Sequence, residues 1–228
     1  MQKHLIYKPQ AFFTLKYVAA IRIWHWLTFL LMTASLVTVL FASTLFEHDY
    51  DITFDKGKQP PTAQIEGEHN FDPSKLSPEE KASFTYEHKL WDVHKIIGFG
   101  LCFLLVSRIV IEASRNKEDR LFKRINNAIN IKVYSKEEQQ NKKYYLIVKT
   151  SYLLFYTLFL VMAITGFILA FDDAPIFKNI SRPAHEIHGF VQYLIYAYIL
   201  AHIVGVVRAD MQKQKGIVSA MINGGNNI

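Results

Sequence analysis

The sequence predicts an all-α fold, a transmembrane bundle of four helices. Half of the 228 residues are hydrophobic, and they gather in four blocks that are each long enough to cross a bilayer core of about 30 Å. The connections between the blocks are polar, and their charge changes from one connection to the next. We therefore expect a single membrane domain over residues 1–228 rather than two soluble domains.

The four predicted helices cover about residues 22–46, 93–113, 145–171 and 187–207. The first block is too long for the apolar core of a signal peptide, and no site of the A-x-A type follows it, so we expect it to be retained as a helix. Arg108 and Lys149 lie near the ends of their blocks. Long basic side chains at such positions can reach the polar interface.

The charges of the connections predict how the helices are oriented. The outer loop, about residues 47–90, has about ten acidic residues against five lysines, whereas the inner loop, about residues 114–143, has about nine basic residues against four acidic ones. The two tails are basic as well. Since basic residues stay on the cytoplasmic side, we expect both termini inside. Nucleic-acid binding is disfavoured, because the basic residues are divided among several loops.

Two polar stretches have features of short helices. "SPEEKASF" at 77–84 has Ser77 at a helix N-cap and Pro78 at the first helical position. "RLFKRINNAI" at 120–129 has the pattern of an amphipathic helix at the membrane surface. The outer loop is either a solvated loop or a docking surface for an external partner.

Histidines occupy unusual places in this chain. "HEIHGFVQYLIYAYILAH", residues 185–202, is mostly apolar but begins and ends with histidine. His188 and His202 are 14 positions apart, which on a helix brings them within about 40° of the same direction and separates them by roughly 21 Å along the axis. Two imidazoles therefore share one helix face at two depths.

Four histidines lie inside the apolar blocks and pair by depth. His94 and His188 are expected near the outer surface, and His25 and His202 near the inner surface. A lone membrane histidine often only packs between helices, but ionisable groups in membranes are costly and usually functional. Zinc or copper sites would need further ligands nearby, which these blocks lack. Two imidazoles instead suit the axial positions of haem, so we expect two haems between the helices.

Other residues have weaker signals. Cys102 is the only cysteine and there is no C-x-x-C-H motif, which excludes disulfides and covalent haem attachment, so the haems would be non-covalent. His185 is an alternative outer ligand, and His88 is expected in a loop. The remaining candidates are glycines that would let a macrocycle approach a helix (Gly98, Gly205), arginines that would meet haem propionates (Arg22, Arg108, Arg208) and tryptophans of an aromatic belt (Trp24, Trp26).

Three stretches resemble a known family. "RIWHWLT" at 22–28, "HKIIGFGLCFLLVSRI" at 94–109 and "IHGFVQYLIYAYILAHIVGVVRAD" at 187–210 look like the bacterial cytochrome b561 and Ni/Fe-hydrogenase b-type cytochrome family. The tail "DMQKQKGIVSAMINGG" is similar to that of the hydrogenase subunits. The resemblance implies two b-type haems in four helices of the bacterial inner membrane, with His25 and His202 ligating the inner haem and His94 and His188 the outer one.

The resemblance also implies a quinone site. Related formate dehydrogenase cytochromes place quinone near the inner haem, beside an asparagine that precedes the third helix, and Asn141 is the nearest match. Lys143 stands where that pattern has a glycine. The first outer loop is longer, and the loop before the fourth helix shorter, than in the hydrogenase subunits.

We therefore expect an electron-transfer subunit that passes electrons between a periplasmic Fe–S enzyme, a Ni/Fe hydrogenase in particular, and the quinone pool. One alternative is a stand-alone quinol oxidase of the cytochrome b561 type that reduces a small external oxidant such as superoxide. Another is a membrane scaffold or transporter whose histidines relay protons.

Overall fold

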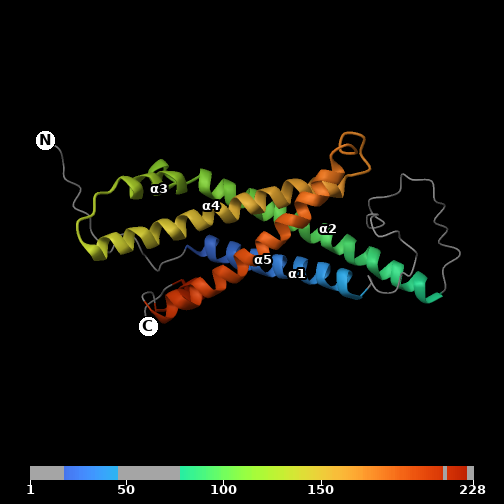
Figure 1. Cartoon of the computed structure of the whole chain (residues 1–228), viewed down its shortest axis with the longest axis horizontal. Helices are drawn as coiled ribbons and strands as arrows, with labels where there is room; N and C mark the ends of the chain where they lie inside the picture. Colours follow the sequence, from blue (N-terminus) through green and yellow to red (C-terminus); the bar gives the residue numbers. More distant parts are fainter. Residues whose placement is uncertain (1–17, 46–77, 213–214, 225–228) are drawn as a thin grey trace. The chain divides into compact units, whose positions relative to one another are not determined.

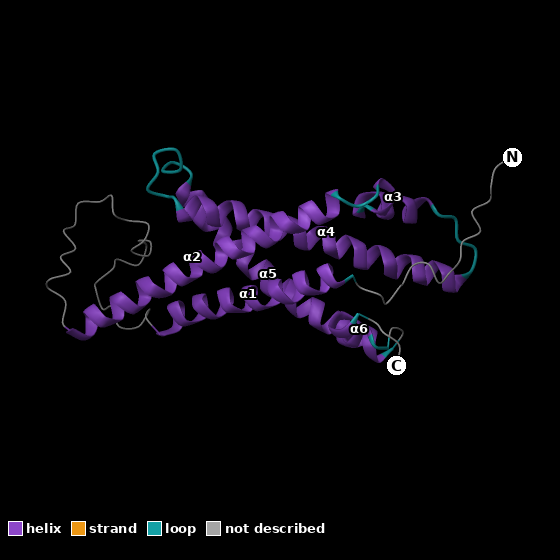
Figure 2. Ribbon diagram, turned by 180° about the vertical axis from the view of Figure 1, so that it is seen from behind, coloured by secondary structure: helices purple, strands orange, loops and turns teal. Residues whose placement is uncertain are grey.

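The computed structural model describes residues 18–45, 78–212 and 215–224. This part of the chain consists of helices and the turns between them, without a strand (Figure 1, Figure 2). The long helices are α1 (Ala19–Leu45), α2 (Pro78–Ala113), α4 (Lys136–Ala170) and α5 (Ser181–Met211). The short ones are the 3₁₀ helix η4 (Lys117–Asp119), α3 (Leu121–Asn130) and α6 (Ile217–Asn223).

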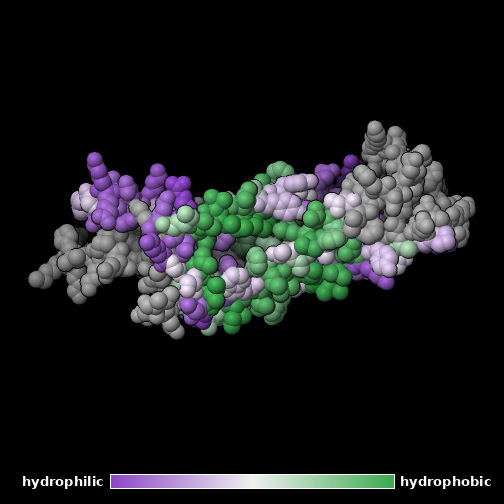
Figure 3. All heavy atoms as spheres, turned by 90° about the horizontal axis from the view of Figure 1, so that it is seen from below, coloured by the Kyte–Doolittle hydropathy of each residue, from purple (hydrophilic) through white to green (hydrophobic). Residues whose placement is uncertain are grey.

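Each long helix contains a stretch that is long and apolar enough to cross a membrane. The four stretches are Ala19–Ala42, Thr85–Ala113, Lys136–Ala170 and Ser181–Met211. Many of their large apolar side chains are exposed, such as Phe103 (72%) and Ile96 (69%), and Figure 3 shows these apolar surfaces in green. Side chains of this kind would contact lipid in a bilayer. The prediction of an all-helical chain with four membrane-length helices is confirmed for the described residues.

The second long helix begins earlier than the apolar block predicts. α2 starts at Pro78, as the motif at 77–84 indicates, although Ser77 itself lies outside the described residues. Residues 78–90, predicted as the end of the outer loop, are therefore helical, and so is His88, which we expected in a loop. The remainder of the predicted outer loop falls within 46–77, outside the described residues.

The third long helix also begins before its apolar block, because of a local capping arrangement. The Ser135 side chain accepts a hydrogen bond from the Glu138 N–H (3.1 Å), and the Glu138 carboxylate accepts one from the Ser135 N–H (3.2 Å). Such reciprocal bonds satisfy the donors at a helix start. α4 thus begins at Lys136, and Asn141, predicted just before the helix, lies within it.

The short helices differ in how well they were predicted. α3 confirms the helix predicted at about 120–129. Its first N–H group, that of Leu121, donates to Glu112 Oε1 at 2.7 Å, which attaches α3 to the end of α2. α6 was not predicted, since its seven residues are too few to show helical periodicity.

The described chain divides into two compact units, and each long helix contributes a segment to both. Of the described residues, unit 1 comprises 18–27, 104–162, 189–212 and 215–224, and unit 2 comprises 28–45, 78–103 and 163–188.

In unit 1, Trp24 of α1 connects three helices. Its side chain is buried, its indole N–H donates to the Leu104 carbonyl of α2 at 2.7 Å, and its ring lies 6.1 Å from that of Tyr156 of α4. Phe155 of α4 in turn stacks on Tyr198 of α5, with ring centroids 5.2 Å apart. The aromatic-belt prediction for Trp24 is therefore wrong, because an indole with a buried partner stabilises helix packing instead.

In unit 2, small and aromatic residues bring the helices together. A Cβ added to Gly100 of α2 would lie 3.1 Å from Leu31 Cδ1 of α1, so α1 and α2 approach closely at this point. Phe99 of α2 packs against Phe171, directly after α4, with ring centroids 6.0 Å apart.

Candidate functional site

Two of the predicted histidines face one another in unit 1. His25 on α1 is half-buried and His202 on α5 is exposed. Their ring centroids are 6.3 Å apart and their planes are inclined by 49°. A bond between a metal ion and an imidazole nitrogen is about 2 Å long, so two rings on opposite sides of one ion have centroids roughly 6 Å apart. The separation therefore suits one metal ion between the two rings.

The His25 ring also has an unsatisfied nitrogen. Its Nδ1 atom is buried and finds no hydrogen-bond partner among the described residues. Leaving a buried polar atom unpaired costs about 1–3 kcal/mol, and native proteins rarely accept this cost without a reason. The position therefore indicates a partner that the described chain does not itself supply.

In unit 2, hydroxyl groups of α1 hold the His94 ring. Nδ1 of His94 lies 3.2 Å from the Thr38 hydroxyl and 3.3 Å from the Ser35 hydroxyl. The Thr38 hydroxyl donates its single proton to the Ser35 carbonyl at 2.7 Å. Thr38 can then only accept from His94, so a proton on Nδ1 is the arrangement that lets His94 bond to Thr38.

This hydrogen bond determines which nitrogen of His94 can bind a metal. A neutral imidazole protonated at Nδ1 has its lone pair at Nε2, which is the nitrogen available as a ligand. Metal-binding histidines usually donate their second ring N–H to an oxygen in this way. The Thr38 contact therefore prepares His94 to bind through Nε2.

His188 on α5 has the same type of support from α4. Its Nδ1 atom lies 2.9 Å from the Thr165 hydroxyl, and Thr165 is buried. A Cβ added to the next residue, Gly166, would lie 3.2 Å from His188 Cε1. Such a contact is tighter than nine in ten of those that real Cβ atoms make, so glycine at 166 gives the ring its room. His185, the alternative ligand, is exposed, so the packing favours His188.

The surroundings of the four histidines fit a flat cofactor better than a metal held by side chains alone. No group of three or more His, Cys, Asp or Glu side chains suited to one metal ion occurs among the described residues. The spaces next to Gly98 and Gly205 are open, since a Cβ at either position would have no neighbour within 4 Å. A macrocycle that supplies the remaining four ligands would complement pairs of histidines.

A family model described as prokaryotic cytochrome b561 matches residues 16–224, which include all four long helices. The chain belongs to the prokaryotic cytochrome b561 family. It is thus a membrane protein of a family of b-type cytochromes, for which electron transfer and b-type haem are implied. Searches of the curated proteins and of the solved structures each found no match.

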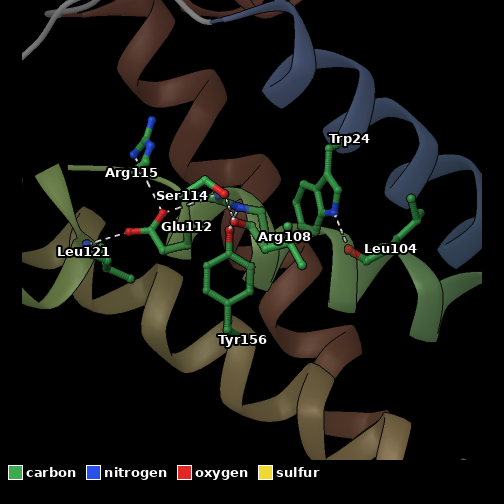
Figure 4. Close-up of polar contacts among 9 residues, drawn as sticks. Trp24, Leu104, Arg108, Glu112, Ser114, Arg115, Leu121 and Tyr156 are labelled. Carbon is green, nitrogen blue, oxygen red and sulfur yellow. Dashed lines mark hydrogen bonds and ion pairs between the residues drawn. The ribbon is translucent and has the colours of Figure 1, made fainter. Parts of the chain in front are cut away.

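Three arginines of this cytochrome b561 family protein were predicted to contact haem propionates, and Arg108 has the most side-chain contacts of the three. Its Nε donates to the Tyr156 hydroxyl at 2.8 Å, and its guanidinium lies over the rings of Trp24 (5.8 Å) and Tyr156 (5.6 Å). Nη1 faces Glu112 at 3.4 Å but makes no hydrogen bond to a described residue. Figure 4 shows this cluster, in which Arg108 faces both Tyr156 and Glu112.

The other two arginines of the cytochrome lie on α1 and α5. Arg22 donates from Nη1 to the Ile222 carbonyl of α6 at 2.7 Å, while its buried Nε has no hydrogen-bond partner among the described residues. Arg208 is exposed in the last turn of α5. Arg22 therefore has the more restricted position, one turn before His25.

A cavity of about 620 Å³ lies along α4 near the predicted quinone residue. Asn141 is half-buried and lies in the sequence between Gln139 and Lys142, which both line the cavity. The walls are mainly apolar, with polar side chains at intervals. The lining residues are Val133, Gln139, Lys142, Lys143, Leu146, Ile147, Thr150, Ser151 and Leu154.

Sequence reasoning did not identify the residues that support the histidines. Ser35 and Thr38 occur three positions apart in an apolar helix, and Thr165 with Gly166 interrupts another. Hydroxyls within a membrane span need a partner, because lipid offers none. A hydroxyl residue at the same depth in the membrane as a predicted histidine was therefore the sequence pattern that could have indicated these contacts.

Proposed function

We propose that this chain is a dihaem cytochrome b of the bacterial inner membrane, with both termini in the cytoplasm. It would pass electrons between a periplasmic Fe–S enzyme, such as a Ni/Fe hydrogenase, and the membrane quinone pool. The observation that carries this proposal is the facing pair His25 and His202, at a ring separation that suits one ion, in a chain of the b561 family.

Each histidine has a defined role in the proposal. His25 and His202 hold the inner haem, and His94 and His188 hold the outer one. Thr38 orients the His94 ring, as Thr165 does for His188. When bound, haem supplies reversible one-electron transfer at its iron, and the protein contributes ligand orientation and a low-dielectric site.

The arginines complete the inner site in this proposal. Arg22 has a buried nitrogen without a hydrogen bond to a described residue, and so has Arg108. Carboxylates form strong charge-assisted hydrogen bonds with guanidinium groups. We therefore assign the inner haem propionates to Arg22 and Arg108, with Arg208 as an additional, exposed contact.

A reduced-minus-oxidised spectrum with a pyridine haemochrome count tests the haem assignment. The protein purified from haem-replete membranes should contain two b-type haems per chain. His202→Ala and His94→Ala should each retain about one, because each removes one axial ligand. The matched control is His185→Ala, on the same helix as His202, which should retain both.

Well-folded protein without haem would contradict the cytochrome assignment and favour the proton-relay alternative. A loss of haem in His185→Ala, with retention in His188→Ala, would show that His185 is the outer ligand on α5. Co-purification of an Fe–S subunit separates the proposed electron-transfer complex from a stand-alone quinol oxidase.

We place the quinone headgroup in the α4 cavity, whose volume lies in the usual range for small-molecule pockets. Its apolar wall suits a ring with an isoprenoid tail, and Lys142 and Lys143 provide donors for the quinone oxygens, beside Asn141. Leu146→Trp, which fills part of the cavity, should slow quinone-dependent oxidation of the haems and leave both haems bound. Leu160→Trp, at an exposed position of the same helix, is the control and should leave the rate unchanged.

A further inference from the structure

A second group of basic residues lies at the end of α2 and does not belong to the proposed haem or quinone sites. Arg115, in the turn after α2, and Arg124, on α3, are both half-buried. Together with Ser114, Asn116 and Asp119 they line a polar cavity of about 270 Å³. The two arginines and the Asn116 amide offer hydrogen-bond donors and positive charge, whereas the Ser114 hydroxyl already donates to the Val110 carbonyl at 2.8 Å and Asp119 is a carboxylate.

The charges around this cavity are not balanced by the carboxylates nearby. Lys149 of α4 interacts electrostatically with three arginines and one glutamate, namely Arg108, Arg115, Arg124 and Glu112. Arg108 belongs to the proposed inner haem site, and without it three cations, Lys149, Arg115 and Arg124, still stand against the two carboxylates of Glu112 and Asp119. Cations held close together in a partly buried place repel one another, since water screens them poorly there.

The single nearby glutamate is already shared among several partners. Glu112 Oε1 accepts the N–H of Leu121 at 2.7 Å, and Oε2 pairs with Arg108 at 3.4 Å and with Arg115 at 3.8 Å. Figure 4 shows these contacts. Glu112 therefore cannot neutralise Arg124 and Lys149 as well, and the cavity has an excess of positive charge.

The neighbouring helix indicates where this cavity lies relative to the bilayer. α3 exposes the large apolar side chains Phe122 (70%) and Ile129 (55%), which are seven positions apart and therefore on the same face. Its basic residues Lys123 and Arg124 follow directly after Phe122. A short helix of this type lies in the headgroup region of a membrane.

We propose that this cavity binds a phosphate group, supplied by the headgroup of an anionic phospholipid. Arg115 and Arg124 would contact the phosphate oxygens, Asn116 would add a hydrogen bond, and Lys149 would contribute positive charge. Basic pockets beside membrane helices suit such headgroups. An anionic lipid is favoured over a zwitterionic one, because it has no cation of its own to oppose the excess positive charge.

Titration of the delipidated full-length protein with phosphatidylglycerol tests this site, with binding followed by native mass spectrometry. The double variant Arg115→Gln/Arg124→Gln should bind phosphatidylglycerol about tenfold more weakly than the original protein does, as expected for the loss of hydrogen bonds to a charged group. The matched control is Lys123→Gln, which also removes one charge from α3 but at an exposed residue that pairs with Glu118 at 3.8 Å. It should bind within about twofold of the original protein.

Two further arms identify the source of the phosphate. Phosphatidylcholine should bind weakly and equally to all variants, and inorganic phosphate at millimolar concentration should displace little phosphatidylglycerol. Equal binding of phosphatidylglycerol to the double variant and the control would overturn the site. Tight binding of inorganic phosphate, lost in the double variant, would overturn the lipid as its source. Arg124→Lys keeps the positive charge and should therefore bind phosphatidylglycerol more tightly than the double variant does. Circular dichroism should show the same helix content in all variants, which excludes a folding defect as the cause of weaker binding.

Discussion

Hydroxyl side chains determine how two of the four histidines are presented. The Thr38 hydroxyl uses its own proton for the Ser35 carbonyl and so can only accept a hydrogen bond from His94 Nδ1. The Thr165 hydroxyl lies 2.9 Å from His188 Nδ1 and so holds that ring by one hydrogen bond. By contrast, His25 Nδ1 has no hydrogen-bond partner among the described residues. The two histidine pairs therefore offer different electronic environments to the groups they would bind.

Replacing Thr38 with valine should raise the midpoint potential of the outer haem by on the order of 20–60 mV. The ring of His94 would then donate a weaker hydrogen bond, become a less electron-rich ligand and stabilise the oxidised iron less. A spectroscopic redox titration measures this shift. Thr44→Val is the control, because the Thr44 hydroxyl bonds only within α1, to the Leu40 carbonyl. Equal shifts in the two variants would refute a role for Thr38.

Gly166→Ala should displace the His188 ring and reduce the content of outer haem to well below one per chain. The added Cβ would lie 3.2 Å from His188 Cε1, closer than nearly all such contacts allow. Gly189→Ala tests the same change beside His188 in the sequence, where a Cβ would have no neighbour within 4 Å. Gly189→Ala should keep both haems. A pyridine haemochrome count gives the haem content of each of the two variants. If Gly166→Ala also keeps both, the ring is not confined as the packing indicates.

At the scale of the element, α6 attaches the C-terminal part of the chain to α1. Arg22 donates to the Ile222 carbonyl at 2.7 Å and Trp26 to the Met221 carbonyl at 3.2 Å. Glycines with left-handed backbone conformation bound the helix on both sides, Gly216 with φ +85° and Gly224 with φ +91°. The second of these lies directly against the Arg22 guanidinium.

Gly224→Ala should destabilise α6 more than Gly216→Ala does. Both substitutions strain a left-handed backbone, at a cost of about 1–3 kcal/mol. Only the first places a Cβ 3.2–3.4 Å from the Arg22 guanidinium, whereas a Cβ at Gly216 has no neighbour within 4 Å. Hydrogen exchange should therefore become faster in α6 and around Arg22 in Gly224→Ala. Equal exchange in the two variants would show that the contact with Arg22 contributes nothing.

Sequence patterns predicted the apolar cores of the helices better than their ends. A long apolar block is unambiguous, but polar extensions such as 136–144 depend on a cap like that of Ser135 with Glu138. The S-x-x-E spacing was visible there and would have predicted the start of α4. α6 could not be foreseen, since its stability depends on contacts with α1 that are distant in the sequence.

The candidate site was predicted in a similar, partial way. Histidines within apolar blocks are conspicuous because of their cost in a membrane, so His25, His94, His188 and His202 were selected as candidate ligands from the sequence alone. Thr38 and Thr165 were not, because hydroxyls occur often in membrane helices and only the fold shows which ring they contact. The same holds for Trp24, whose partner is a backbone carbonyl.

At the scale of the whole molecule, the distribution of charge predicts the orientation in the membrane. On a Cys102→Ala background, Lys178→Cys should react with a membrane-impermeant maleimide from the periplasmic side, and Lys132→Cys only after the membrane is permeabilised. Both lysines are exposed, so access to the side chain does not limit either reaction. The opposite labelling pattern would invert the topology and exchange the inner and outer sites.

The facing pair of His25 and His202 has a consequence for biogenesis. One imidazole comes from the first membrane helix and the other from the last, with nearly the whole chain synthesised between them. The ribosome therefore releases most of the protein before this pair can form. If haem binds between these two rings as proposed, its insertion there is a late step, because a chain that ends before α5 lacks one of the two imidazoles.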